Sequence, residues 1–231
     1  MHRREFIVGL GGAASWPLAA RAQQPGGVRR LGVLMGTAEN DLQGKAFFSG
    51  FMQGLGKLGW SDGRNLRIDI RWAPGSVERT QMFAKELVDL QPDVILVGST
   101  SQTAALQRET HSIPIVFATV SDPVGEGFVA GLSRPGGNIT GFITSEASLA
   151  GKWLELLTEI APSVKRSAIM FNPETAPGRG SYFLPAFETA AQALKVEPIA
   201  APVHSDVEIE TVITSLGREP VGGLVVMPDT L

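Results

Sequence analysis

The sequence contains no cysteine, and this absence removes several kinds of chemistry at once. Without cysteine there is no disulfide, no thiolate metal site and no cysteine nucleophile. For the same reason we expect no lipid-modified cysteine behind an export signal. The fold and any binding site are therefore built from packing, hydrogen bonds and charges.

Motifs of catalysis and cofactor binding are also scarce. Beyond the first residues only His111 and His204 remain as histidines, and they do not stand at a metal-ligand spacing. The chain has no G-x-S-x-G nucleophile elbow and no G-x-x-x-x-G-K-[ST] phosphate loop. A G-x-G-x-x-G pattern ends at Gly59, but it follows a helical period and precedes a strand, which is typical of a helix end. We expect no cofactor, no metal and no catalysed reaction.

The charge balance indicates no polyanionic partner. The formal net charge is -3, charged residues make up 19% of the chain, and no basic excess is present. We therefore expect no nucleic-acid partner. The 231 residues are enough for one large domain or two small ones.

The first 22 residues have the features of an export signal. Arg3 and Arg4 precede an uncharged stretch from Ile7 to Ala20, which is too short and too interrupted to span a membrane. An A-x-A cleavage site follows, with cleavage expected after Ala22. The paired arginines resemble a twin-arginine signal, although the general secretion route stays open. We expect a periplasmic protein without a lipid anchor.

Short apolar runs alternate with segments of helical period along the rest of the chain. This alternation is typical of a parallel α/β sheet. Strands are expected at 31–35, 66–72, 94–97, 113–117, 167–171, 196–200 and 223–227. Helices are expected at 48–58, 83–90, from 102 onward, and at 123–132, 149–160, 187–194 and 209–216. Residues 133–141 are dense in turn formers and are expected to form a loop.

The two halves of the chain follow one plan. The strand that begins near Arg29 parallels the one that begins near Lys165, and the later elements correspond in order. We therefore expect an N-terminal Rossmann-like lobe at 29–141 and a second such lobe at 142–231. The second lobe has fewer pieces than the first, and we expect it to be truncated.

Polar residues follow the predicted strands at their carboxyl ends, where ligands bind in open α/β sheets. These stretches begin at Gly36, Gly98, Thr119, Asn172 and Pro228. The hydroxyls of Ser99, Thr100 and Ser101 at a helix start suit a small anion, but plain N-capping explains them as well. Asp122 before a proline is either a helix cap or a partner for a ligand ammonium. Asn172 and Asp229 would face the same cleft from the other lobe.

Four stretches of the chain together resemble a known family. They are RREFI with PLAARAQQ, GFMQGLGKLGWSDGRNLRIDIRWA, IPIVFATVSDPVGEGFVAGLSRPGGNITGF and KWLELLTEIAPSVKRSAIMFNP. The chain resembles the substrate-binding proteins of ABC importers, in the group related to tryptophan- and tyrosine-binding proteins. The resemblance implies a type I periplasmic binding fold, in which two doubly wound parallel-sheet α/β lobes close over a ligand. The second lobe would be incomplete.

The resemblance also implies a function and a set of site residues. A small ligand, such as an amino acid or related carboxylate, would be bound without reaction and passed to an ABC permease in the inner membrane. The implied ligand contacts are Thr37, Ser99, Thr100, Ser101, Ser121, Asp122, Asn172 and Asp229. The implied hinge contains Gly136, Gly137, Asn138, Thr140 and Gly141. A ligand-sensing domain of a membrane receptor and an exported α/β enzyme remain the alternatives.

Overall fold

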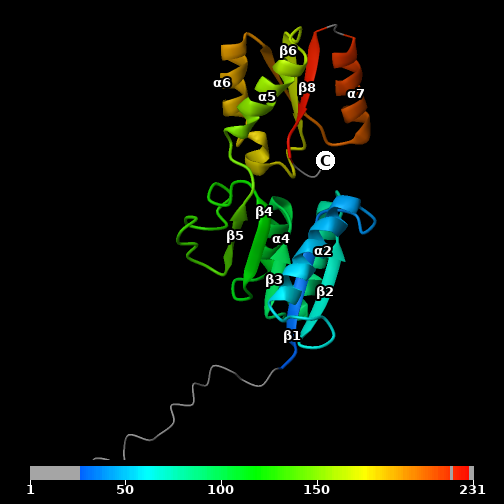
Figure 1. Cartoon of the computed structure of the whole chain (residues 1–231), viewed down its shortest axis with the longest axis vertical. Coiled ribbons are helices and arrows are strands. Elements are labelled where there is room, and N and C mark those ends of the chain that lie inside the picture. The colour runs from blue at the N-terminus through cyan, green and yellow to red at the C-terminus, as the bar shows by residue number, and fades with distance from the viewer. Residues whose placement is uncertain (1–26, 219–220, 229–231) are drawn as a thin grey trace, which may run out of the picture.

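The computed structural model describes residues 27–218 and 221–228, which form two α/β lobes (Figure 1). Each lobe is built on one parallel sheet, of five strands in the first lobe and three in the second among the described residues. The chain passes from the first lobe to the second at residues 144–148. The predicted export signal at 1–22 and the predicted contact Asp229 lie outside the described residues.

The first sheet has the strand order β2-β1-β3-β4-β5. Its strands are β1 (Arg29–Met35), β2 (Leu66–Trp72), β3 (Val94–Val97), β4 (Ile115–Val120) and β5 (Ile139–Ile143). The connecting helices are α2 (Leu42–Lys57), α3 (Val77–Asp89) and α4 (Thr100–Glu109).

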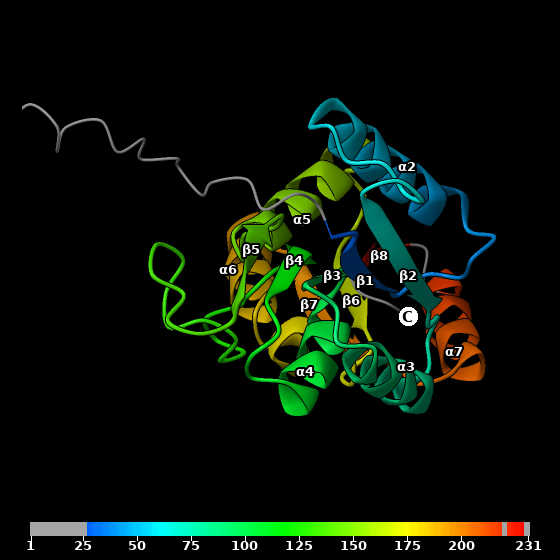
Figure 2. The same cartoon turned by 90° about the horizontal axis from the view of Figure 1, so that it is seen from below.

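Helices cover both faces of the first sheet. Figure 2 shows α3 and α4 on one face and α2 on the other. Strand β1 lies between two neighbouring strands and is buried from Leu31 to Met35. A strand covered on both faces needs apolar side chains at successive positions, which explains the continuous run in β1.

The second sheet has the order β7-β6-β8. Its strands are β6 (Arg166–Phe171), β7 (Glu197–Pro202) and β8 (Gly222–Val226). Helices α5 (Leu149–Ile160) and α6 (Leu184–Leu194) pack on one face, and α7 (Asp206–Gly217) packs on the other. A 3₁₀ turn, η1 (Pro177–Gly180), joins β6 to α6.

The topology confirms that the two lobes share one plan. In the first lobe β1 is flanked by β2 and β3, and in the second β6 is flanked in the same way by β7 and β8. The helix that follows β1 or β6 covers one face of its sheet, and the next helix along the chain covers the other. The second lobe is the incomplete one, because its described sheet stops at the equivalent of β3.

Two predictions between β4 and the second lobe were wrong. Residues 123–132 form a turn and irregular backbone in place of a helix. Gly127 has φ +71° directly after one hydrogen-bonded turn, and glycines lower helix propensity. The predicted loop at 133–141 contains the start of β5, which is parallel to β4. Gly141 permits this pairing, because a Cβ there would stand 2.1 Å from the Phe117 carbonyl oxygen.

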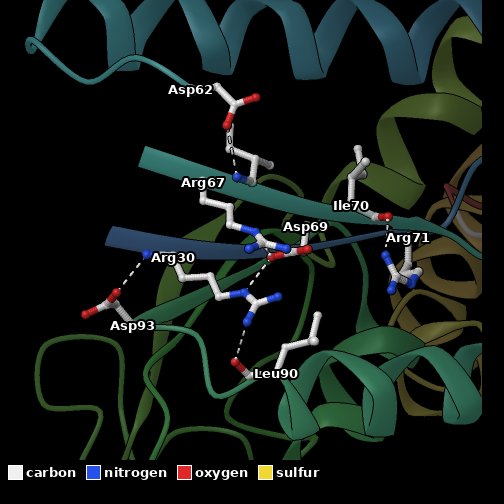
Figure 3. Close-up of polar contacts among 9 residues, drawn as sticks. Arg30, Asp62, Arg67, Asp69, Ile70, Arg71, Leu90 and Asp93 are labelled. Carbon is white, nitrogen blue, oxygen red and sulfur yellow. Dashed lines mark hydrogen bonds and ion pairs between the residues drawn. The ribbon is translucent and has the colours of Figure 1, made fainter. Parts of the chain in front are cut away.

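Arg30 ties the amino ends of the first sheet together (Figure 3). Its Nε donates to Asp69 of β2 at 2.6 Å, and its Nη1 donates to the Leu90 carbonyl at 3.0 Å. Its backbone N–H donates to Asp93 at 2.7 Å. The hydrogen bond from Arg30 holds the pKa of Asp69 below its ordinary value of 3.8. The contact thus links the edge strand β2 to its neighbour β1.

The second core makes a matched mutational test possible on α5. Leu154 is fully buried and Leu156 is 54% exposed. We expect Leu154→Ala to lower the free energy of unfolding by about 3–5 kcal/mol, because a cavity is left behind. Leu156→Ala should cost less than about 1 kcal/mol. Denaturant unfolding measures both, and equal losses would contradict the packing of α5.

The Arg30–Asp69 contact predicts a pH dependence of stability. A carboxyl group with a lowered folded pKa stabilises the fold above its ordinary pKa, and this contribution is lost as pH falls through the folded value. We expect Asp69→Asn to lower the melting temperature at neutral pH and to reduce the further loss on acidification below roughly pH 4. Asp89→Asn, which alters an exposed ion pair with Lys85, is the control. Parallel acid curves for wild type and Asp69→Asn would refute the role of Asp69.

Candidate functional site

The carboxyl ends of both parallel sheets face each other across the gap between the lobes (Figure 1). A pocket with a volume of about 110 Å³ lies there, lined mainly by α3, α4 and the segment before α3 of the first lobe. Ser101 and Gln102 at the start of α4 line it from the first lobe, while Glu174 and Thr175 after β6 line it from the second. Loops that follow strands of both lobes therefore line one pocket, at the edge where ligands bind in open α/β sheets.

Among the described residues, hydrogen bonds connect the second lobe to the first lobe and to the segment that crosses between them. The Gly178 N–H donates to Glu126 Oε1 of the first lobe at 2.6 Å. The Tyr182 hydroxyl donates at 3.3 Å to the carbonyl of Ser145, in the segment that crosses between the lobes. Burial raises the pKa of Tyr182, and the charge of Asp122 raises it further.

An apolar cavity of about 310 Å³ lies on the α2 side of the same strand ends. Polar residues at the ends of β1, β3 and β4 form one side of it, namely Thr37, Ser99 and Thr119. The remaining wall is largely apolar and includes Met35, Phe47, Phe48, Phe51 and Leu96. The cavity therefore combines a polar rim with an aromatic interior, which is the usual character of a small-molecule site.

The first turn of α4 is the polar centre of the site. Ser99 occupies the N-cap position, but its side chain makes no capping hydrogen bond. The Ser99 hydroxyl donates to Gln102 Oε1 and lies 3.2 Å from the Ser101 hydroxyl. By contrast, Ser76 caps α3 and Ser205 caps α7 through their side chains. Plain N-capping thus does not account for Ser99, and the positive end of the α4 dipole stays directed at the gap.

The other predicted contacts of the first lobe lie at the same edge. Thr37 follows β1, and its Oγ1 is buried with no hydrogen-bond partner in the described part of the chain. Thr100 is the first residue of α4 and is partly exposed. Ser121 is 6% exposed directly after β4. Asp122 accepts a hydrogen bond from the Gly125 N–H at 2.8 Å, so it closes the turn after β4, and residues 123–132 after it form no helix to be capped.

Asn172 is the predicted contact from the second lobe, and it directly follows β6. Its Oδ1 accepts a hydrogen bond from the Glu174 N–H at 2.9 Å, and its backbone carbonyl accepts from the N–H groups of Thr175 and Ala176. These bonds shape the loop that supplies Glu174 and Thr175 to the pocket between the lobes. The position of Asn172 matches the prediction, and its part in binding stays a prediction.

The predicted hinge residues do not lie in the segment that crosses between the lobes. Gly136, Gly137 and Asn138 precede β5, at the amino edge of the sheet, because Ile139 pairs with Ile115 at the start of β4. Asn138 is held there by donation from Nδ2 to the Ile113 carbonyl at 2.7 Å. Thr140 and Gly141 lie within β5. The crossing runs through residues 144–148 instead.

Three residues of the site were not singled out from the sequence. Gln102 lines the pocket between the lobes, Glu126 bonds to the second lobe, and Tyr182 bonds to the segment that crosses between the lobes. Glu126 and Tyr182 are isolated polar residues in irregular segments, where no periodicity marks them. Gln102 stands directly after the three hydroxyl residues, and that neighbourhood was the available signal.

Metal and membrane features are not found in the described ranges. Residues 27–218 and 221–228 hold no group of three or more histidine, aspartate or glutamate side chains that could bind a metal ion. Over the same ranges, no helix combines the length and the apolar character needed to cross a membrane.

Known proteins match both the sequence and the fold. A tyrosine-binding protein of Clostridioides difficile (strain R20291) is 30% identical over 167 residues, which cover 72% of this chain and 47% of the relative. A conserved domain protein of Vibrio cholerae superposes with a TM-score of 0.74 at 26% identity, covering 84% of this chain and 63% of that one. A protein from Streptococcus pneumonia in complex with L-Trp superposes with a TM-score of 0.76 at 23% identity, covering 88% and 66%.

The chain spans about half the length of the curated relative and about two thirds of the two solved chains. A family profile described as ABC transporter substrate binding protein matches residues 41–231. This match covers most of the chain, including the residues of both lobes that line the gap. The chain belongs to the ABC transporter substrate binding protein family.

Proposed function

We propose that this chain is the solute-binding component of an ABC importer, exported to the periplasm, where it binds an amino acid or a related carboxylate. The observation that carries the proposal is the pocket between the lobes, lined by Ser101 and Gln102 from one side and by Glu174 and Thr175 from the other. A ligand held by both lobes stabilises their closed arrangement, which a permease can then recognise.

The polar centre of the site suits a carboxylate. The first-turn N–H groups of α4 lie at the positive end of the helix dipole, and the Ser99 side chain does not cap them. The hydroxyl of Ser101 adds a further donor at this position. Asp122 directly follows β4 at the same edge of the sheet, and its carboxyl group is our candidate partner for a ligand ammonium. Carboxylate and ammonium together describe an amino acid.

The apolar cavity beside α2 suits the ligand's side chain. Its volume of about 310 Å³ and its three phenylalanines would accept an aromatic or branched group. The name of the Clostridioides difficile relative supports an aromatic amino acid as the first ligand to test. Because the cavity shares Thr37 and Ser99 with the polar edge, one molecule could contact both regions.

Ligand binding is tested by thermal shift and calorimetry on the full-length protein. We expect L-tyrosine, L-tryptophan, L-phenylalanine or L-leucine to raise the melting temperature, while ribose and adenosine leave it unchanged. A ligand at 100 times its Kd stabilises the fold by about 2.7 kcal/mol. No shift with any of these amino acids would refute the proposed ligand class.

The role of Asp122 has its own test. We expect Asp122→Asn to weaken binding of the amino acid about tenfold or more, because the ammonium loses its charged partner. Binding of the matching acid without the amino group should change little. Asp89→Asn, in an exposed pair on α3, is the control and should bind like wild type. Equal losses for both ligands would show that Asp122 supports the turn at Gly125 only.

Lobe closure gives a test that does not depend on the ligand's identity. The Gly178 N–H to Glu126 bond holds the lobes together at the rim. Glu126→Ala should shift the free protein toward a more open arrangement by roughly fivefold, since a hydrogen bond of this kind contributes about 1 kcal/mol. Small-angle scattering measures the change. Glu126→Gln keeps an acceptor and should stay near wild type, and an unchanged radius of gyration in Glu126→Ala would contradict the role.

A further inference from the structure

We propose that Gln102 determines the specificity of this site by donating a hydrogen bond from its side-chain amide to an acceptor oxygen of the ligand, a carboxylate oxygen in the first instance. This inference rests on the proposed function and adds to it a residue that was not among the predicted contacts. Three features of Gln102 support it. The side chain is buried, its Oε1 accepts a hydrogen bond, and its Nε2 donates none within the described ranges.

Gln102 is buried in the first turn of α4, with 1% of its surface exposed. Long polar side chains are seldom buried to this extent without a full set of hydrogen bonds. The Ser99 hydroxyl donates to Gln102 Oε1, which fixes the carbonyl side of the amide. The orientation of the side chain is therefore set before any ligand arrives, and Nε2 is the end that remains available.

The Nε2 atom makes no hydrogen bond within the described ranges. It lies at the end of β1, where a Cβ on Gly36 would come within 2.5 Å of it. Glycine at position 36 thus leaves the space that this amide group occupies. Nε2 is not among the buried side-chain atoms that lack a partner in the described ranges, so this end of the amide still meets solvent, as a donor open to a ligand does.

A second unpaired group lies at the same end of β1. Thr37 Oγ1 is buried and has no partner among the described residues. Gly44 makes room for it, because a Cβ there would stand 2.2 Å from this oxygen. Thr37 and Gln102 therefore each place a polar atom beside a glycine near this end of β1, and that of Thr37 is buried without a partner in the described ranges. Both groups lie beside the predicted ligand site, and they support it separately from the α4 dipole.

The chemistry of the amide defines what it selects. The NH₂ group of glutamine only donates, so it binds an oxygen acceptor and offers nothing to an ammonium at the same point. Within the pocket it lies on the side that also carries Ser101 and Arg108, while Glu174 faces them from the second lobe. An acceptor oxygen is therefore expected toward α4, and a donor group of the ligand toward the second lobe.

The test uses the full-length protein and the tightest binder among L-tyrosine, L-tryptophan, L-phenylalanine and L-leucine. Gln102→Met keeps the volume of the side chain and removes the donor, and it should weaken binding at least tenfold. Gln102→Glu should weaken binding further at neutral pH, because two carboxylates would then face each other. Its affinity should partly recover near pH 5, where a buried glutamic acid is protonated and donates again. Gln192→Met, an exposed position on α6, is the matched control.

A structural role for Gln102 predicts a different stability. If the amide nitrogen is free to bind a ligand, Gln102→Met should lower the melting temperature of the free protein no more than Ser99→Ala does, because both variants lose the Ser99 bond to Oε1. If the amide nitrogen instead holds α4 in place, the melting temperature should fall by several degrees more in Gln102→Met than in Ser99→Ala. This measurement needs no ligand, and a clear excess loss in Gln102→Met would overturn the inference.

The binding outcomes separate the two proposals. If wild type binds an amino acid and Gln102→Met binds it equally well, the assignment of Gln102 is wrong and the proposed function stands. If wild type binds none of the four amino acids, the proposed function fails and the assignment of Gln102 fails with it. A tenfold loss in Gln102→Met, with recovery of Gln102→Glu at lower pH and an unchanged Gln192→Met, supports the assignment.

Discussion

The parallel direction of the strands within each sheet is the constraint on which the site depends. Because β1, β3 and β4 run the same way, the residues that follow them gather at one edge of the first sheet. The residues that follow β6 gather likewise at one edge of the second. The two edges face each other, as the shared pocket and the Gly178–Glu126 bond show. A reversed strand would carry its polar loop to the far side of its lobe.

The arrangement of polar groups at this edge has some cost to the fold, as expected if these groups bind a ligand. The Ser99 hydroxyl, which could cap α4, is bonded to the side chain of Gln102 instead. Thr37 Oγ1 is buried without a partner among the described residues. Where stability is the main requirement, as at α3 and α7, the serine at the helix start caps its helix. The serines at the starts of α3 and α7 therefore cap their helices, whereas we predict a binding role for Ser99 at the start of α4.

Much of the fold could be predicted, and the failures have identifiable causes. The strands β1 and β6 and the helix α5 were predicted because their apolar spacing is regular and long. The prediction of a helix at 123–132 was wrong, because the apolar residues of this segment suggested a helix while its glycines favour a turn. Strand β5 was missed because Gly141 signals a loop in sequence, whereas in the structure it allows close approach to Phe117. Local propensity cannot show which backbone will lie against a glycine.

Periodicity and turn chemistry along the chain were enough to predict the two-lobed α/β plan and the hydroxyl and carboxyl groups that follow the strands. Which of those groups meet depends on the folded arrangement of the two sheets. Folding brings Gln102 into one pocket with Glu174, and the Tyr182 hydroxyl to the Ser145 carbonyl, across large separations in sequence. It also placed the crossing between the lobes at 144–148 and not at Gly136–Gly141. Such pairings depend on strand register and on the relative position of two sheets, which no local pattern of residues encodes.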